Sequence, residues 1–399
     1  MGGISTALVF GEIGLVRSLG EAGIKVIAAG TDAYRAAYAS RYVDEAMVFP
    51  SYASPAFVEK LLQVGRKFKE KPVLLTDNDK PILAFSRHRK DLSEFYRFLL
   101  PDEALIEDLV DKRRFSLLAE RHPLPVPRTF LPATVEDLKE IADRIAYPCI
   151  LKPAHQDIWK NDAIVNRLFK GRYKKAIRFN DPAALVALYE QLHPISPEMI
   201  VQEFVEGRDE QLYDVHAYLN EHSEVLACFV GRKLRTSPIH FGMGCYTVGV
   251  IDKEIETVAL AALRRIGYKG IAAMNLKRDP RNGAIKILEI NPRCSLWNYL
   301  ASRSGVNIPA LACADSIGQS WKIQNPHRVG LHWWNMKEDL KSMMEYRRVG
   351  EWTMGRWVRS LLDKKVCHVF SWRDPAPALY SFLEFMRSRL KHFIKINRM

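Results

Sequence analysis

The chain has 399 residues, of which 48% are hydrophobic, and a formal net charge of +13. This length predicts two or three domains with a sizeable core. The six cysteines include no C-x-x-C pair, which argues against a zinc site or a disulfide framework and favours a reducing cytoplasm. No stretch approaches the roughly 20 apolar residues that cross a bilayer, so we expect a cytoplasmic protein that is soluble or peripheral to the inner membrane surface.

The first 100 residues begin with a strand, a helix and a second strand over residues 7–29, which is typical of a parallel βαβ unit. Residues 11–14, Gly-Glu-Ile-Gly, do not complete G-x-G-x-x-G, so no NAD site is expected. A further apolar strand at 72–75 runs into polar residues that include Asp77 and Asp79. Such residues either line a ligand crevice or cap the following helix.

A Pro-rich stretch at 122–127 marks a domain junction after a charged helical segment. The segments that follow predict an α+β region. We expect helices near 134–145, 181–192 and 253–266, and strands near 148–153, 199–205, 211–219, 224–231, 245–251 and 271–278.

The segment 287–293, Ile-Leu-Glu-Ile-Asn-Pro-Arg, reads as the end of a strand. Side chains alternate along a strand, so Glu289 and Asn291 project together. Their oxygens suit Mg²⁺, which commonly bridges protein carboxylates to phosphates, and Arg293 can clamp phosphate oxygens. A polar strand end beside a turn is the alternative. Lys152 also closes an apolar strand, where a nucleotide phosphate or a structural ion pair would offset its desolvation.

Lys112, Lys152, the hinge 203–207, Asn275 and the segment 289–293 together resemble the ATP-grasp superfamily in order and spacing, over roughly residues 1–318. The resemblance is closest to the carbamoyl-phosphate synthetase large-subunit-like branch of carboxylate-amine ligases. It implies an α/β and α+β architecture: a Rossmann-like preceding domain (1–100), a first ATP-grasp lobe (101–195), a second lobe with the metal site (196–320) and a basic, Trp-rich C-terminal extension (321–399).

The resemblance implies a role for each matching residue. Lys112 and Lys152 would face ATP phosphates, Glu203, Phe204 and Val205 would frame adenine, Asp209 or Glu210 would meet the ribose, Asn275, Glu289 and Asn291 would hold Mg²⁺ or Mn²⁺, and Arg293 would meet the transferred phosphoryl group.

Two departures from the family pattern stand out. Many relatives have a carboxylate or Gln where this chain has Asn275, and an amide brings no charge to the metal. The segment 154–161 has no glycine, although a Gly-rich loop is expected to close over the triphosphate there. The basic run 170–175 either replaces those backbone amides or is a solvated turn.

The acceptor region is expected between Arg232 and Gly244. Arg235 would neutralise a carboxylate or an acyl-phosphate oxyanion. His240 is a weaker candidate for a catalytic base, and Arg303 is a further carboxylate-binding candidate.

Together, the motifs and the resemblance predict an ATP-dependent ligase that activates a carboxylate as an acyl phosphate and joins it to an amine, releasing ADP and phosphate. Two alternative functions remain: an ATP-grasp kinase that phosphorylates a hydroxyl, and a non-catalytic ATP-gated binding module. The expected partners are small-molecule carboxylate and amine substrates, with a homodimer left open. No nucleic-acid-binding motif is present, so no nucleic acid is expected.

The C-terminal 80 residues hold 16 Lys or Arg against 7 Asp or Glu, and six of the eight tryptophans. Leu379, Phe382, Leu383, Met386, Leu390 and Phe393 follow a helical spacing, with basic residues around them. We expect this helix to pack on the catalytic domain. Contact with an anionic membrane or glycan is the alternative, because basic amphipathic helices suit interfaces.

Overall fold

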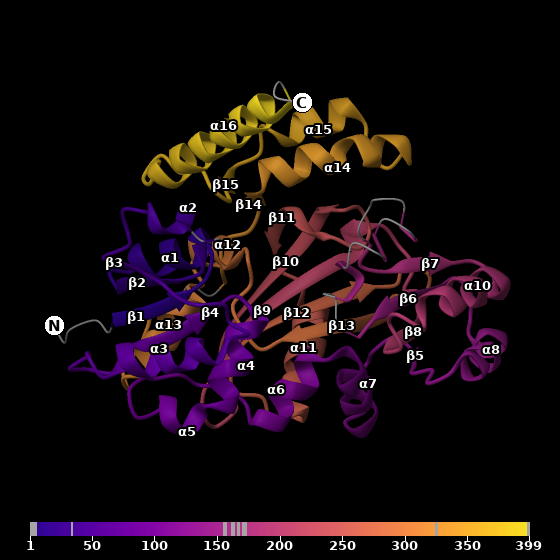
Figure 1. Cartoon of the computed structure of the whole chain (residues 1–399), viewed down its shortest axis with the longest axis horizontal. Coiled ribbons are helices and arrows are strands. Elements are labelled where there is room, and N and C mark those ends of the chain that lie inside the picture. The colour runs from indigo at the N-terminus through magenta and orange to yellow at the C-terminus, as the bar shows by residue number, and fades with distance from the viewer. Residues whose placement is uncertain are drawn as a thin grey trace.

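The computed structural model describes residues 6–32, 35–154, 158–160, 164–165, 168–169, 174–323 and 326–396. It contains three β-sheets flanked by helices, with a layer of three helices from the end of the chain across one side (Figure 1). The six cysteines are free thiols, in keeping with the sequence. No helix within the described residues is long and apolar enough to span a membrane.

The N-terminal sheet is four-stranded and parallel, in the order β3-β2-β1-β4. Strands β1 and β4 are almost entirely buried, because helices cover both faces of this sheet. Its strands are β1 (Thr6–Phe10), β2 (Lys25–Gly30), β3 (Glu45–Val48) and β4 (Val73–Thr76), and its helices are α1 (Ile13–Gly20), α2 (Arg35–Tyr38), α3 (Pro55–Gly65), α4 (Asp79–Arg87) and α5 (Arg89–Leu92).

The polar residues after β4 serve several purposes. Asn78, rather than Asp77 or Asp79, caps α4 by accepting the Lys80 N–H. Asp77 instead accepts the Glu12 N–H at 2.7 Å and so ties the ends of β1 and β4 together. Asp79 lines a cavity that reaches the centre of the molecule, which is the crevice expected at the carboxyl ends of parallel strands.

A second, antiparallel sheet has the order β5-β8-β6-β7. Its helix α8 begins with a capping box between Thr134 and Asp137, and α10 begins at Pro182 after the cap Asp181. The elements here are α6 (Glu103–Val110), α7 (Lys112–Arg121), β5 (Thr129–Phe130), α8 (Val135–Arg144), β6 (Cys149–Pro153), the 3-10 helix η2 (Ile158–Lys160), β7 (Ile177–Phe179), α10 (Pro182–Leu192) and β8 (Met199–Glu203).

The largest sheet has seven strands in the order β13-β12-β9-β10-β11-β14-β15. Helix α11 covers one face of its centre through a large apolar core, and Trp297 and helices α12 and α13 pack on the other side. The elements are η3 (Asp209–Gln211), β9 (Leu212–Leu219), β10 (Val225–Ser237), β11 (Met243–Val250), α11 (Lys253–Arg265), β12 (Gly270–Arg278), β13 (Ile285–Asn291), α12 (Asn298–Arg303), α13 (Ile308–Asp315), β14 (His332–Trp334) and β15 (Lys365–Cys367).

The C-terminal residues join this sheet and then cover it. Strand β14 pairs with β11, and β15 extends the same edge in parallel. Helices α14 (Met336–Arg348), α15 (Met354–Ser360) and α16 (Ala376–Ile396) form the outer layer. The predicted C-terminal helix is therefore present. The helix contacts α2, but Leu379, Phe382, Leu383 and Met386 of its predicted apolar face are exposed, so this face does not pack on the rest of the protein as expected.

Candidate functional site

A cavity of about 250 Å³ lies between the second sheet and the seven-stranded sheet. It continues into a wider cavity of about 690 Å³ that reaches the N-terminal sheet. Both cavities share lining side chains, so they form one cleft from the hinge after β8 to the carboxyl end of β4. The shared residues are Lys112, Lys152, Lys175, Gln202, Met243, Leu288, Glu289, Asn291 and Arg293.

The carboxylate of Glu289 lines this cleft, and two side-chain amides lie beside it. Antiparallel pairing of β12 and β13 sets Asn275 opposite Glu289, and the Asn275 amide donates to its carboxylate at 2.6 Å. Asn291, two residues along β13, donates to the same oxygen at 3.4 Å. Among the described residues no group of three or more His, Cys, Asp or Glu could hold a metal. One carboxylate with amide oxygens still fits Mg²⁺, which commonly takes few protein ligands and completes its shell with phosphates and water.

Lysines surround this carboxylate. Burial raises the pKa of Glu289, but Lys233, Lys112 and Lys175 outweigh it, and the net pKa lies below the ordinary value. Burial, and then the charge of Lys112, lowers the pKa of Lys152 to about 8. The positive charges of these lysines outnumber the negative charge of Glu289. Such an excess of positive charge attracts polyphosphates.

Lys112 and Lys152 come from different elements, α7 and β6, and both line this cleft. Lys152 donates to Gln202 at 3.0 Å, and Lys112 donates to the carbonyl of Ala154 at 3.2 Å. Lys233 on β10 donates to the side-chain oxygen of Asn275. Sequence reasoning gave Lys233 no role, although it falls within the stretch assigned to the acceptor.

The hinge after β8 lines the other end of the cleft through Glu203, Phe204 and Val205. Arg178 and Lys277 lie over the Phe204 ring, 4.4 and 4.9 Å from its centroid. Of the glycine-free segment 154–161, residues 155–157 and 161 lie outside the described residues, as do residues 170–173 of the basic run.

Neither Asp209 nor Glu210 is among the described residues that line the cleft, so the ribose contact expected of them does not follow from this geometry. Asp209 is 2% exposed and accepts hydrogen bonds from Thr236 and Tyr346. Glu210 forms an ion pair with Arg356 at 2.6 Å. Tyr346 lies in α14 and Arg356 in α15. The sequence near residues 203–210 gives no sign that these two distant helices pack there.

Arg293 lies in the cleft near Glu289. Its side chain lines both parts of the cleft and pairs with Asp79 at 2.5 Å. Asp79 and Asp77 help raise the pKa of Arg293 against the effect of burial. The guanidinium therefore stays positively charged in the cleft that Glu289 also lines, where it can bind an anion.

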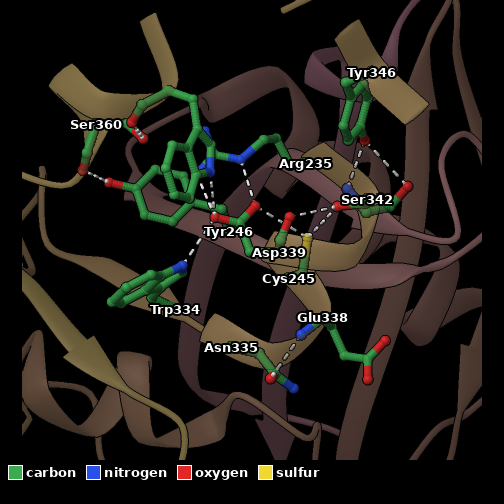
Figure 2. A network of polar contacts seen from close by, with 12 residues as sticks. Arg235, Cys245, Tyr246, Trp334, Asn335, Glu338, Asp339, Ser342, Tyr346 and Ser360 are labelled. Atoms are coloured by element: carbon green, nitrogen blue, oxygen red, sulfur yellow. Dashed lines mark hydrogen bonds and ion pairs between the residues drawn. The ribbon is translucent and has the colours of Figure 1, made fainter. Parts of the chain in front are cut away.

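Arg235 does not occupy the predicted place. It is fully buried, pairs with Asp339 of α14, and lies 4.1 Å from the ring centroid of Tyr246 and 4.4 Å from that of Trp352 (Figure 2). The register between β10 and β11 shifts between Lys233 and Arg235. A bulge of this kind redirects side chains, so Lys233 lines the cleft and Arg235 enters the core beneath α14.

The other two acceptor candidates also have partners within the protein. His240 lines the cleft, with its ring nitrogens 3.7 Å from Asp209 and 3.6 Å from Glu351. The nearby carboxylate of Asp209 raises the pKa of His240, which favours the charged form over a base. Arg303 pairs with Glu21 at 3.1 Å and is not among the described lining residues.

Asp214 was missed by sequence reasoning. It lies opposite Asn275 on β9, lines the cleft and is 4% exposed. The alternation of β9, with Leu212, Asp214 and His216 on one face, is the signal that would have found it.

No family model matches the sequence. The chain is 28% identical to D-aspartate ligase of Enterococcus faecium over 317 residues, which are 76% of this chain and 74% of that protein. It is 23% identical to the carbamoyl phosphate synthase large chain of Gemmatimonas aurantiaca over 67% of its own length, and it spans about a quarter, 24%, of that longer protein.

These homologues, and the structural neighbours of the chain, are ATP-grasp carboxylate-amine ligases. These relatives confirm the carboxylate-amine ligase branch that the sequence resembles. The fold agrees with an ATP-grasp structure, the biotin carboxylase domain of the Hydrogenobacter thermophilus 2-oxoglutarate carboxylase, solved with MgADP and bicarbonate. That match has a TM-score of 0.61 at 16% identity and covers 82% of this chain and 73% of that one. The cleft between the second sheet and the seven-stranded sheet is therefore the candidate active site.

Proposed function

We propose that this chain is an ADP-forming ligase that joins a carboxylate to an amine in the cleft around Glu289. One observation carries the proposal: the half-buried carboxylate of Glu289, flanked by Asn275 and Asn291, shares one cavity with a group of lysines and Arg293. Such a site suits a magnesium-bound triphosphate and a second anion next to it.

In the first step a carboxylate oxygen of the substrate attacks the γ-phosphorus of ATP, and the bond to the β,γ-bridging oxygen breaks to release ADP. Phosphoryl transfer needs little covalent work from the protein, so positioning and charge stabilisation dominate. Lys112 and Lys152 hold the triphosphate, and Arg293 holds the phosphoryl group as it moves. Asn275, Glu289 and Asn291 would hold Mg²⁺, or Mn²⁺, which neutralises charge on the phosphates when bound.

In the second step the amine nitrogen attacks the acyl carbon, and the bond from that carbon to the phosphate oxygen breaks. The amide forms, phosphate leaves, and the amine loses a proton. Lys233 lies beside Asn275 and is placed to stabilise the oxyanion that develops on the acyl group. This is the task that the sequence had assigned to Arg235.

The likeness to D-aspartate ligase favours an amino acid as one substrate. An amino acid carries a carboxylate, and the surplus of positive charge near Arg293 would draw it to the phosphoryl group. The wider part of the cleft, at the edge of the N-terminal sheet, has room for the second substrate.

The test is an ADP-release screen in which single amino acids, hydroxy acids and uronic acids are offered with and without amines. A ligase gives ADP release that depends on a carboxylate, and adding hydroxylamine turns the acyl phosphate into a hydroxamate. A kinase would release ADP with a hydroxyl compound and give no hydroxamate. ATP binding without substrate-dependent ADP release would indicate a binding module and refute the proposal.

A further inference from the structure

The C-terminal helix α16 presents its large apolar side chains to solvent. Leu379, Phe382, Leu383 and Met386 follow the spacing i, i+3, i+4, i+7, which places them on one face. They are 60, 58, 47 and 50% exposed. An amphipathic helix of a globular protein normally buries its apolar face. In α16 this face points to solvent instead.

The small residues of α16 face the protein instead. Pro377 is buried, and Ala378 and Ser381 are half-buried, on the side away from the apolar face. The helix lies beside α2 of the N-terminal unit (Figure 1). Small residues of α16 therefore face the protein, and Leu379, Phe382 and Leu383 are left exposed.

A buried ion pair fixes the start of this helix. Asp374 is fully buried and accepts from Arg17 at 2.9 Å, from Ser40 at 2.8 Å and from the Arg41 N–H at 2.9 Å. Arg17 also donates to the carbonyl of Val369 at 2.7 Å. Because these contacts hold the segment just before α16, the exposed face is a stable feature of the surface.

Positive charge accompanies the exposed apolar face. Residues 376–399 contain five Lys or Arg and one acidic residue, Glu384. Arg387 and Arg389 are exposed and flank the apolar face in the helical repeat, one on each side. Trp372, just before the helix, is 88% exposed. Aromatic and cationic side chains around an apolar stripe are the features that suit the boundary between lipid headgroups and acyl chains.

We propose that α16 is a membrane-surface helix that lies in the headgroup region of an anionic bilayer, with Leu379, Phe382, Leu383 and Met386 directed into the lipid. The helix lies in the plane of the interface, since no described helix can span a bilayer. A second copy of this chain is a poorer occupant, because α16 would bring the same positive charges face to face. The inference is independent of the reaction in the cleft.

The experiment is co-sedimentation of the full chain with vesicles of phosphatidylcholine alone or mixed with phosphatidylglycerol. We expect binding only to the anionic vesicles, and weaker binding as salt rises. Phe382→Gln with Leu383→Gln should abolish it. Arg387→Gln and Arg389→Gln should weaken it about fivefold each, the effect typical of one basic residue near an anionic surface. Circular dichroism verifies that each variant keeps its fold.

Leu362→Gln is the matched control, because Leu362 is 85% exposed and lies outside α16. It should bind vesicles like the natural chain. Equal loss of binding in this variant would overturn the assignment to α16, as would equal binding to neutral and anionic vesicles. A dimer in light scattering that Phe382→Gln with Leu383→Gln dissociates, with no vesicle binding by the natural chain, would show that a second copy covers this face and would also overturn it.

Discussion

Arg235 and Asp339 form an ion pair with no exposed side-chain surface, although 104 residues separate them in the chain. Two parallel hydrogen bonds of 2.6 and 2.8 Å join the guanidinium to the carboxylate (Figure 2). The indole N–H groups of Trp334 and Trp357 donate to the same carboxylate. This contact fastens α14 to β10, the strand that carries Lys233 into the cleft.

Asp339→Ala should lower the free energy of unfolding by about 3–5 kcal/mol, because it leaves a buried guanidinium and two indole donors without their acceptor. Urea unfolding followed by tryptophan fluorescence measures the change. Arg235→Met combined with Asp339→Leu should recover part of the loss, since it removes both charges. Glu190→Ala breaks the exposed pair with Lys139 and should cost less than about 1 kcal/mol. Equal effects of Asp339→Ala and Glu190→Ala would contradict the role of the buried pair.

Glu289→Gln should leave the fold intact and reduce ADP formation by about 100-fold or more. Removing one preorganised electrostatic group from a reaction centre costs about 3 kcal/mol of transition-state stabilisation. Without this charge the lysines around it repel one another, and the metal loses its one carboxylate ligand among Asn275, Glu289 and Asn291. The measurement is substrate-dependent ADP release at saturating Mg²⁺. Glu221→Gln, at an exposed turn, should retain full activity, and an equally active Glu289→Gln would refute the metal-site assignment.

The rate at low ATP should fall as the pH rises above about 8. Burial and Lys112 lower the pKa of Lys152 to about 8, so the free protein loses the charge that holds phosphate above that pH. The profile of kcat/KM for ATP against pH tests this, because it reports ionisations of the free enzyme. Lys152→Arg keeps its charge and should remove this decline. For stability the sign is reversed: the folded chain binds fewer protons than the unfolded chain between pH 8 and 10.5, so this group makes the fold more stable as pH rises through that window.

Local patterns in the sequence predicted the longer strands, whereas the short strands β3, β5, β7, β14 and β15 were not predicted. Alternation along β13 placed Glu289 and Asn291 on one face, and the antiparallel register then set Asn275 opposite Glu289. Lys112 was assigned through the resemblance to the ATP-grasp superfamily, and Lys152 through that resemblance and its place near the end of an apolar strand. The face on which Glu289 and Asn291 lie follows from the two-residue repeat of a strand, which a short stretch of sequence is enough to show.

The wrong predictions depend on contacts between distant segments. Arg235 is turned out of the cleft by a bulge in β10 and is held by Asp339, and Asp209 is held by Tyr346 from the same helix. The apolar face of α16 was expected to pack inward because its spacing is that of a core helix. Spacing shows only that an apolar face exists, not which way it points, and among the described side chains of α16 the buried one is Pro377.

Gly242→Ala should disrupt the acceptor end of the cleft, because a Cβ at this position would lie 2.1 Å from the Ser237 carbonyl and 2.2 Å from that of Pro238. These are backbone atoms, so the loop that carries His240 and Gly242 into the cavity must move. A displacement of about 1 Å at a reacting group can cost about 100-fold in rate, so we expect a loss of that order in substrate-dependent ADP release. ATP affinity, measured by calorimetry, should change little, because the hinge and lysines that hold the nucleotide lie on other strands. Gly355→Ala, where a Cβ meets nothing within 4 Å, is the matched control and should keep full activity. Normal turnover by Gly242→Ala would show that this loop does not position the acceptor.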